Sequence, residues 1–330
     1  MSIEDFMIFC GQRANKPEEA FNSGTENIFN SPEIMDHLSR VRHDPELAFY
    51  RDGMYMLKDG VVEFKLNPFL KHGGNKIHPY ITKVPFSASE DFYGCVREYY
   101  APFRDSNDLI PDNLYYIVFD PVGKSKTDRK EISIKHSLNA FHVMMYPNNI
   151  VPGGGDMIVA SYSGRPLQME DADRMVWLAC KRWNAKLLVE TDRGNTVANF
   201  RRWNALHMLI KDPTTIINEK LNPNINANYG MNIGGGDKSK DALIYIRDWL
   251  YEPVSQTEDD KVLYRFHYIY DLPLLLELVN YNENGNFDRL SALKLAMYQR
   301  QAYRVLKRKP KESATTTTLG KIGLAERLFV

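Results

Sequence analysis

The chain has 330 residues, of which 43% are hydrophobic and 25% are charged. This composition is typical of a folded globular protein, and the length suffices for one large domain or two smaller ones. Lysine and arginine together number 42, as do aspartate and glutamate, so the formal net charge is zero. That balance excludes a protein that holds nucleic acid through overall positive charge, although it leaves room for a local basic surface.

The chain shows no sign of a membrane segment or of a disulfide framework. No stretch approaches the roughly 18 consecutive apolar residues of a membrane helix, and residues 1–10 lack a basic segment before an apolar one. The three cysteines, Cys10, Cys95 and Cys180, lie far apart. This spacing argues against a CxxC zinc site and indicates a reducing compartment. We therefore expect a soluble intracellular protein.

The first third of the chain predicts a connector followed by short strands. Residues 1–45 contain no long periodic element, and we interpret them as an interdomain connector with few contacts to the rest of the chain. Residues 46–110 contain short aromatic and β-branched runs, at 54–57, 61–64 and 80–82, between Asp-Gly and Gly-Gly pairs. Such runs between turn residues predict a small β-containing extension.

From Leu114 onward, apolar runs and helical spacing alternate. The predicted strands are 114–119, 139–146, 157–161, 187–189 and 207–210. The predicted helices are 170–183, 196–203, 238–250, 272–279 and 288–305. Three strands followed by alternating helices and strands predict an α/β fold, a mixed sheet with helices on both faces. Trp177 and Trp183, on the first of these helices, are expected in the core.

The C-terminal segment from Arg304 to Val330 carries seven basic residues against two acidic ones and includes four consecutive threonines. This composition does not favour a stable fold. We expect a basic flexible tail over residues 306–330, and the sequence leaves open whether the tail is only solvated or contacts DNA or a partner.

Three acidic residues stand at the ends of predicted elements. Asp120 ends the first strong strand, Glu190 follows the fourth, and Asp288 opens the last helix. Residues at strand ends leave the packed core, so they can meet at one edge of a mixed sheet. Mg²⁺ prefers carboxylate oxygens, and a two-metal site needs several of them. The pattern is therefore compatible with a two-metal site.

Each acid also has a purely structural interpretation. Asp120 can begin a turn, Asp288 can cap the helix that follows it, and Glu190 can face solvent. Asp192 would share the face of Glu190 only if the strand continued that far, because side chains alternate along a strand. Asp128 lies in a charged segment that favours solvent exposure. Spacing alone leaves both interpretations open.

Other catalytic motifs are incomplete. Gly123, Lys124 and Ser125 match the end of a phosphate-binding P-loop, but Val118 stands where that loop needs its first glycine. The eight histidines form no HxxxH or HExxH pair, and no serine lies in a GxSxG elbow. The sequence therefore encodes no ATPase site, histidine zinc site or hydrolase elbow of these types.

The order of the acidic motifs resembles the nuclease domain of the large terminase subunit of tailed bacteriophages and herpesviruses. Residues 116–123, followed by Asp128, resemble the family's first-strand motif. Residues 187–197 resemble its second motif, with Asp192 in place of the usual asparagine. Residues 237–240 resemble the Thr-Lys segment that precedes the last helices. Residues 286–293 resemble the closing motif, although Asn286 stands where many members have histidine.

The resemblance covers residues 115–300 and implies an RNase H-like nuclease domain over 111–305. It implies that Asp120, Glu190 and Asp288 hold two Mg²⁺ or Mn²⁺ ions, with Asp192 and Asp128 as accessory ligands. Residues 17–21 resemble the segment that joins the family's ATPase domain to its nuclease. We therefore expect the ATPase domain of the same polypeptide to lie outside these 330 residues.

The resemblance further implies a metal-dependent endodeoxyribonuclease that cuts concatemeric viral DNA during genome packaging in the host-cell cytoplasm. Its implied partners are double-stranded DNA, the portal protein and the small terminase subunit. Arg193, Lys238, Lys240 and Arg289 are the candidate DNA-binding residues. Two alternatives remain open: a catalytically silent module that docks DNA or the portal, and another RNase H-like nuclease such as a resolvase or transposase.

Overall fold

The structure is a computed structural model. It describes residues 27–44, 46–47, 49–67, 78–84, 93–122, 137–151, 154–192, 194–218, 228–234, 236–283 and 285–308. Two of the candidate site residues, Asp128 and Arg193, lie outside these ranges. So do most of the predicted connector (1–26) and most of the predicted tail (309–330).

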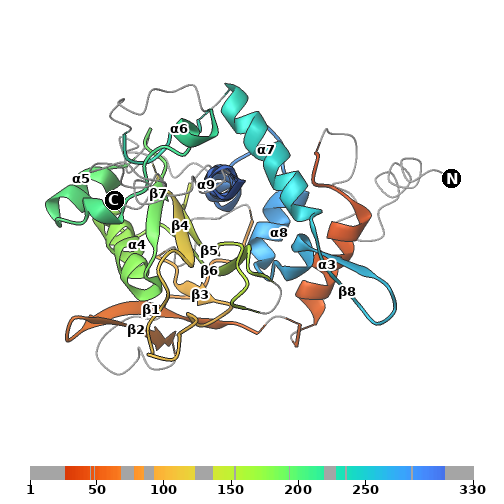
Figure 1. Cartoon of the computed structure of the whole chain (residues 1–330), viewed down its shortest axis with the longest axis horizontal. Coiled ribbons are helices and arrows are strands. Elements are labelled where there is room, and N and C mark those ends of the chain that lie inside the picture. Colours follow the sequence, from red (N-terminus) through yellow and green to blue (C-terminus); the bar gives the residue numbers. More distant parts are fainter. Residues whose placement is uncertain are drawn as a thin grey trace, which may run out of the picture.

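A seven-stranded mixed sheet forms the centre of the protein (Figure 1). Its strands, in spatial order, are β2 (Val61–Leu66), β1 (Arg51–Lys58), β3 (Val96–Glu98), β6 (Met157–Gly164), β5 (Asn139–Met145), β4 (Tyr115–Asp120) and β7 (Lys186–Val189). Neighbouring strands are antiparallel except β4 and β7, which are parallel. Three antiparallel strands, β6, β5 and β4, followed by a parallel one, are consistent with an RNase H-like α/β fold.

The inner strands are hidden on both faces. Every residue of β4, β5 and β6 is buried, as expected of near-continuous apolar runs in the middle of a covered sheet. These strands and β7 confirm four of the five predicted after Leu114. β1, β2 and β3 confirm the predicted β extension and continue the same sheet.

The strand predicted at 207–210 is wrong. Residues Leu206–Met208 form the short 3-10 helix η3, and Leu209 pairs with Leu187 through a single parallel bridge. The backbone pairing around it is isolated and irregular: Ile210 N–H donates to the Leu187 carbonyl and Gly230 N–H to the Ile210 carbonyl, both at 2.8 Å, and Lys211 forms a single bridge with Tyr229. Leu209 and Ile210 are buried, while His207 is exposed.

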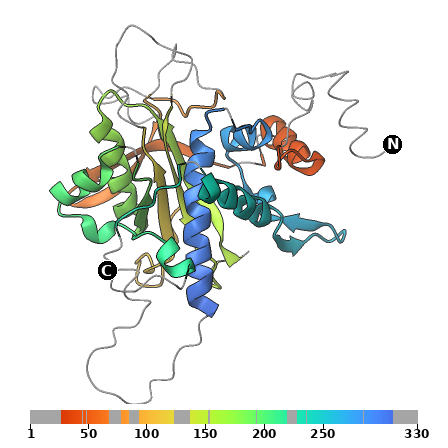
Figure 2. The same ribbon diagram turned by 90° about the horizontal axis from the view of Figure 1, so that it is seen from above.

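Helices cover both faces of the sheet (Figure 2). α4 (Met169–Trp183) and α5 (Thr196–Arg202) lie on one face. The opposite face is covered by α9 (Asp288–Arg308), α7 (Gly236–Leu250), α8 (Leu272–Val279), α6 (Thr214–Ile217) and α3 (Pro32–His43). A hairpin of β8 (Pro253–Gln256) and β9 (Val262–Tyr264) precedes the 3-10 helix η4 (Arg265–Tyr268). None of the described helices is long and apolar enough to cross a membrane.

Alternation along β4 divides the core into two halves. Tyr116 and Val118 point to the side of α9, whereas Ile117 and Phe119 point to the side of α4. On the α4 side Trp183 is fully buried, which confirms its predicted core position, while Trp177 is partly buried. α9 is fixed along β4 by the Tyr116 hydroxyl, which donates to the carbonyl oxygen of Ala296 at 3.2 Å.

The prediction that residues up to 45 make few contacts is wrong for the part that the structure describes. Helix α3 begins at the cap residue Ser31, and its residues Ile34, Leu38 and Val41 are buried in the core on the α9 side. Their 3–4 spacing forms one apolar stripe, which packs against α8 and η4. At the other end, α9 continues through residue 308, so the first three residues of the predicted tail are helical.

Candidate active site

Strand pairing places Asp120 and Glu190 side by side. Phe119 of β4 pairs with Val189 of β7, and the backbone N–H of Glu190 donates to the Phe119 carbonyl at 3.0 Å. Two residues before each acid, Val118 and Leu188 pair with each other and pack on the α9 side. Because side chains alternate along a strand, both carboxylates belong to that same face. Each residue is 5% exposed.

Asp288 reaches the same edge of the sheet from α9. Its Oδ2 accepts a hydrogen bond from the backbone N–H of Leu138 at 2.8 Å and another from Asn286 Nδ2 at 3.2 Å. Leu138 directly precedes β5, in which Ala140 pairs with Asp120. The first residue of α9 is thereby tied to the strand end beside Asp120. Asp288 is 7% exposed.

Asp192 differs from Asp120 and Glu190 in being exposed. Strand β7 ends at Val189, so strand alternation does not continue to Asp192, which is exposed. A Cβ added to Gly234 would lie 2.7 Å from Asp192 Oδ2. The Asp192 carboxylate therefore lies against the loop that precedes α7.

Lys294 brings a positive charge toward the acids. Its Nζ donates to Ser239 Oγ at 2.9 Å and lies 5.7 Å from the centroid of the Tyr281 ring. Burial lowers the pKa of Lys294, and the nearby carboxylates of Glu190 and Asp120 oppose that shift. The sequence analysis missed this residue. Its signal is a lysine between two leucines, six residues after Asp288 on a predicted helix.

The three described cations that were predicted to contact DNA divide into two kinds. Lys238 and Lys240 are exposed in the first turn of α7, where Lys238 Nζ lies 3.5 Å from the carbonyl oxygen of Asn232. Arg289 is 1% exposed, and its Nη1 donates to Glu277 Oε1 at 3.0 Å. A guanidinium committed to a buried carboxylate does not fit the predicted phosphate contact, because exposing it would leave Glu277 buried without its charge partner.

The acids have the right chemistry for Mg²⁺ or Mn²⁺, since all of them offer carboxylate oxygens. Within the described ranges, however, no three His, Cys, Asp or Glu side chains lie close enough together to hold a metal ion. The fold thus places Asp120 and Glu190 side by side and ties Asp288 to the segment before the neighbouring strand. The three carboxylates are not close enough together to form a metal site as they stand.

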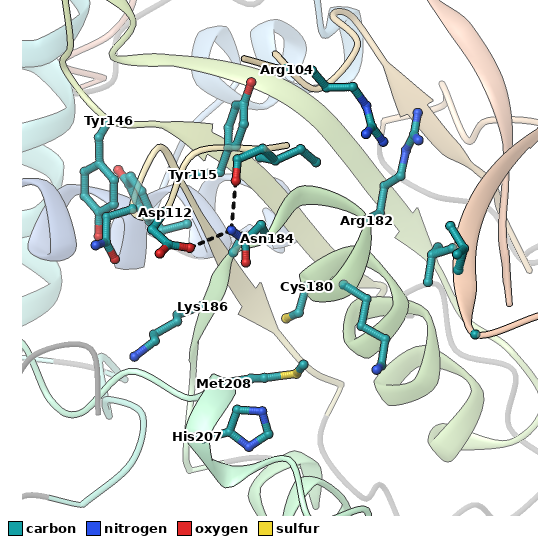
Figure 3. Close-up of a pocket in the computed structure, with 18 residues that line it drawn as sticks. Arg104, Asp112, Tyr115, Tyr146, Cys180, Arg182, Asn184, Lys186, His207 and Met208 are labelled. Atoms are coloured by element: carbon teal, nitrogen blue, oxygen red, sulfur yellow. Dashed lines mark hydrogen bonds between the residues drawn. The ribbon is translucent and has the colours of Figure 1, made fainter. Parts of the chain in front are cut away.

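A separate cavity of about 670 Å³ lies at the opposite ends of the same strands (Figure 3). Tyr115 and Lys186, the first residues of β4 and β7, line it together with the end of α4. Its two arginines form ion pairs within the protein, Arg182 with Glu98 at 3.4 Å and Arg104 with Asp108 at 3.3 Å. Lys181 Nζ lies over the Trp177 ring, 4.7 Å from its centroid. This cavity contains none of the candidate acids.

No protein-family model and no curated protein matches the chain. Among solved structures, the chain is similar to the large terminase nuclease from thermophilic phage G20c. The two share 13% identity and a TM-score of 0.32, over 67% of this chain and 92% of that one. Similarity at this level carries no information about activity, so function has to be inferred from the site.

Proposed function

We propose that this chain is a metal-dependent endodeoxyribonuclease that cuts viral DNA during genome packaging. The observation that carries the proposal is that the parallel strands β4 and β7 place Asp120 and Glu190 side by side: Phe119 pairs with Val189, and the Glu190 N–H donates to the Phe119 carbonyl. Asp288 is tied to the end of the neighbouring strand β5. Mg²⁺ and similar divalent cations bind carboxylate oxygens, so a metal ion would compensate the negative charge of these buried acids.

The three acids would hold the metal ions together in this proposal. Asp120 and Glu190 would hold the metal ions between the two strand ends, and Asp288 would complete the set from α9. The hydrogen bonds from Leu138 and Asn286 occupy Oδ2 of Asp288 and orient its carboxylate. Two bound Mg²⁺ or Mn²⁺ ions would supply an activated water and stabilise the leaving oxygen of the phosphodiester.

Double-stranded DNA is the proposed substrate, because exposed lysines lie near the acids. Lys238 and Lys240 begin α7, directly beside Ser239, which contacts Lys294 of the acidic site. Such cations would hold the DNA backbone without reading its sequence. Concatemeric viral DNA, the portal protein, the small terminase subunit and an ATPase domain of the same polypeptide belong to the proposal through the resemblance of the motifs.

The test is nicking of supercoiled plasmid in Mn²⁺ by the parent and by Asp120→Ala and Glu190→Ala. We expect each variant to lose cleavage by roughly 100-fold or more. Asp248→Ala is the matched control, because Asp248 is an exposed acid on α7 whose partner is the adjacent Arg247. It should cut like the parent, and circular dichroism should show all variants folded.

Two outcomes would replace the proposal. A folded parent that neither cuts DNA nor binds Mn²⁺ at millimolar concentration would be a docking module for DNA or the portal. A parent that cuts four-way junctions or transposon ends in strong preference to plain duplex would be a resolvase or a transposase.

A further inference from the structure

The end of β6 lies at the same edge of the sheet as Asp120. Across the strands, Asp120 pairs with Ala140 of β5, which in turn pairs with Ser163 of β6. Neighbouring strands lie about 4.8 Å apart, so the Cα atoms of Asp120 and Ser163 are roughly 10 Å apart. Arg165 follows two residues later, directly after the last residue of β6. The sheet edge that carries the acids therefore also carries an arginine.

A single peptide group lies between Arg165 and Asp288. Its carbonyl oxygen, that of Ser137, accepts a hydrogen bond from Arg165 Nη1 at 3.0 Å. Its N–H, that of Leu138, donates to Asp288 Oδ2 at 2.8 Å. The bond lengths of one peptide group therefore place Arg165 Nη1 within about 8.5 Å of Asp288 Oδ2. The two charged groups are held near each other by contacts to the same short segment.

The Asn139 side chain joins the ends of β4 and β6. Its Oδ1 accepts a hydrogen bond from the backbone N–H of Val122 at 2.9 Å, and its Nδ2 donates to the Gly164 carbonyl at 3.1 Å. Val122 comes two residues after Asp120, and Gly164 directly precedes Arg165. Asn139 is fully buried, and a buried amide with both ends hydrogen-bonded makes its surroundings rigid. The backbone of Arg165 is thus fixed relative to that of Asp120.

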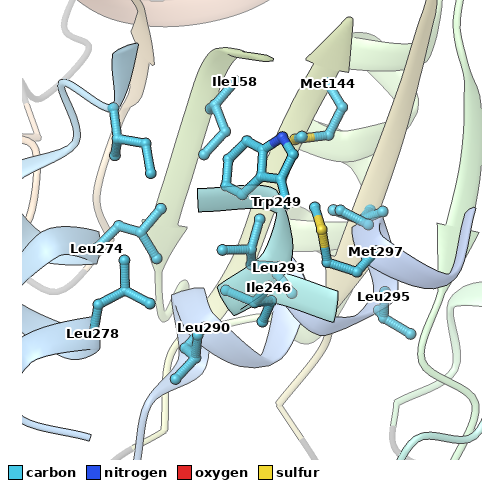
Figure 4. Packing of buried hydrophobic residues seen from close by; sticks show 14 of the residues in the cluster. Met144, Ile158, Ile246, Trp249, Leu274, Leu278, Leu290, Leu293, Leu295 and Met297 are labelled. Carbon is cyan, nitrogen blue, oxygen red and sulfur yellow. The ribbon is translucent and has the colours of Figure 1, made fainter. Parts of the chain in front are cut away.

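The first turn of α9, which carries Asp288, is fixed as well. Leu290 and Leu293 are fully buried, and Figure 4 shows them in the core with Leu278 of α8. The positions of Asp288 and of the Arg165 backbone are therefore set by the packed fold.

Arg165 differs from most buried and partly buried arginines in having no acidic partner among the described residues. The arginines that pair with an acid from such positions are Arg51, Arg97, Arg182, Arg265, Arg289, Arg300 and Arg304. Arg165 is partly buried too, yet within the described part of the chain its polar contact is the Ser137 carbonyl alone. A guanidinium has five N–H donors, so most of them remain for a ligand. Their planar arrangement matches the oxygens of a phosphate.

We propose that Arg165 binds a phosphate of the DNA backbone beside Asp288. The inference rests on the proposed function and adds a substrate contact that the sequence motifs did not indicate. It assigns to Arg165 the phosphate contact that Arg289 cannot make while it is paired with Glu277. Such a contact holds the DNA backbone at the acids through charge and hydrogen bonds, without reading the bases.

The test is filter binding of duplex DNA at several salt concentrations, with Ca²⁺ in place of Mn²⁺. Arg165→Ala should weaken binding roughly tenfold and reduce the slope of log affinity against log salt by about 0.9 in size. Arg165→Lys retains the charge but not the planar fork, so it should keep the slope of the parent and bind more weakly.

Arg104→Ala is the matched control. Arg104 also donates to a backbone carbonyl, that of Asp108 at 2.6 Å, but it lines the cavity at the opposite ends of the strands. Its removal should leave both affinity and slope unchanged. Circular dichroism shows which variants are folded. Arg165→Gln keeps a donor for the Ser137 carbonyl without the charge, so it should repeat the loss of Arg165→Ala and replaces it if alanine prevents folding.

The salt slope separates a phosphate contact from a structural role. A folded uncharged variant of Arg165 with the affinity and slope of the parent would overturn the inference, and so would an equal loss in Arg104→Ala. A parent that binds duplex but does not cut it in Mn²⁺ would refute the proposed nuclease and leave the Arg165 contact standing. A parent that cuts DNA, with uncharged Arg165 variants that keep its slope, would refute the contact alone.

Discussion

Arg300 and Asp156 form a buried ion pair that ties α9 to the start of β6. Arg300 Nε lies 2.9 Å from both carboxylate oxygens of Asp156, and Nη2 donates to Oδ2 at 2.6 Å. Each side chain is 2% exposed. The pair lies in the half of α9 remote from Asp288, so it holds the helix that carries both Asp288 and Lys294 without taking part in the site.

Arg300→Ala should therefore destabilise the protein strongly. It leaves Asp156 buried with Arg265, 3.7 Å away, as its remaining cationic neighbour. Breaking a buried pair in this way costs about 3–5 kcal/mol, to be measured by urea unfolding. Arg304→Ala is the control, because Arg304 pairs with the partly exposed Glu252 and its removal should cost about 1 kcal/mol or less. Equal losses in the two variants would contradict the role given to Arg300.

Buried His37 should make stability depend on pH. Its Nε2 donates to the Ile269 carbonyl at 3.0 Å, and Nδ1 has no hydrogen-bond partner among the described residues. Burial lowers the pKa of His37 to about 4 from 6.5. The folded state thus resists a proton that the unfolded state takes up below pH 6.5, so this contribution to stability is present above pH 6.5 and is lost as the pH falls to 4.

Relative to His37→Phe, the parent should lose up to about 3 kcal/mol of unfolding free energy between pH 6.5 and 4. Urea unfolding at several pH values measures this difference. His43→Phe changes an exposed histidine of the same helix and should keep the pH dependence of the parent. A parent and His37→Phe with parallel pH profiles would refute the assignment.

Gly230 should not tolerate alanine, because its Cα packs against the end of β7, directly before Glu190. It has a φ of 78°, and a Cβ there would lie 2.5 Å from the carbonyl oxygen of Val189. We expect Gly230→Ala to cost roughly 3 kcal/mol or more, from backbone strain and displacement of β7. Gly60 has a similar φ of 83° with nothing within 4 Å of the added carbon. Gly60→Ala should therefore show the strain alone, about 1–2 kcal/mol by urea unfolding.

Lys238 and Lys240 should set much of the salt dependence of DNA binding. Replacing both with alanine should weaken binding to all sequences alike. The slope of log affinity against log salt should fall in size by about 2, since each phosphate contact contributes about 0.9. Filter binding with Ca²⁺ in place of Mn²⁺ measures it. The control is the double variant Lys58→Ala, Lys261→Ala, which removes the same charge from the β1–β2 and β8–β9 hairpins. An equal fall of the salt slope in this control would show only a general charge effect.

The sequence predicted the central strands and most helices because their apolar patterns are local. β4, β5 and α8 are visible as runs bounded by turn residues or proline, and strand ends alone suggested that Asp120 and Glu190 would meet. Asp192 was harder to place, since its direction depends on where β7 stops. Three more residues of strand would have put it on the same face as Glu190.

Other features depend on contacts between segments far apart in the chain. Lys294 has the sequence of an ordinary helix lysine, and only the packing of α7 on α9 brings Ser239 to it across 55 residues. Arg289 looked available to DNA because charged residues are usually exposed, yet α8 places Glu277 beside it. The apolar stripe on α3 is buried only because α8 packs against it, and the sequence does not show that contact.

Helix α9 is synthesised after every strand of the sheet, yet it packs on β4, β5 and β7 in the middle of the fold. A growing chain that still lacks α9 has Asp120 and Glu190 but neither Asp288 nor Lys294, and its sheet lacks the helix that packs on β4, β5 and β7. Under the proposed function, the set of three acids would be complete only after α9 docks, so a partly translated chain would lack the complete metal site. Because α9 is the last of the described elements, the three proposed metal ligands could meet only after every strand of the sheet has been made.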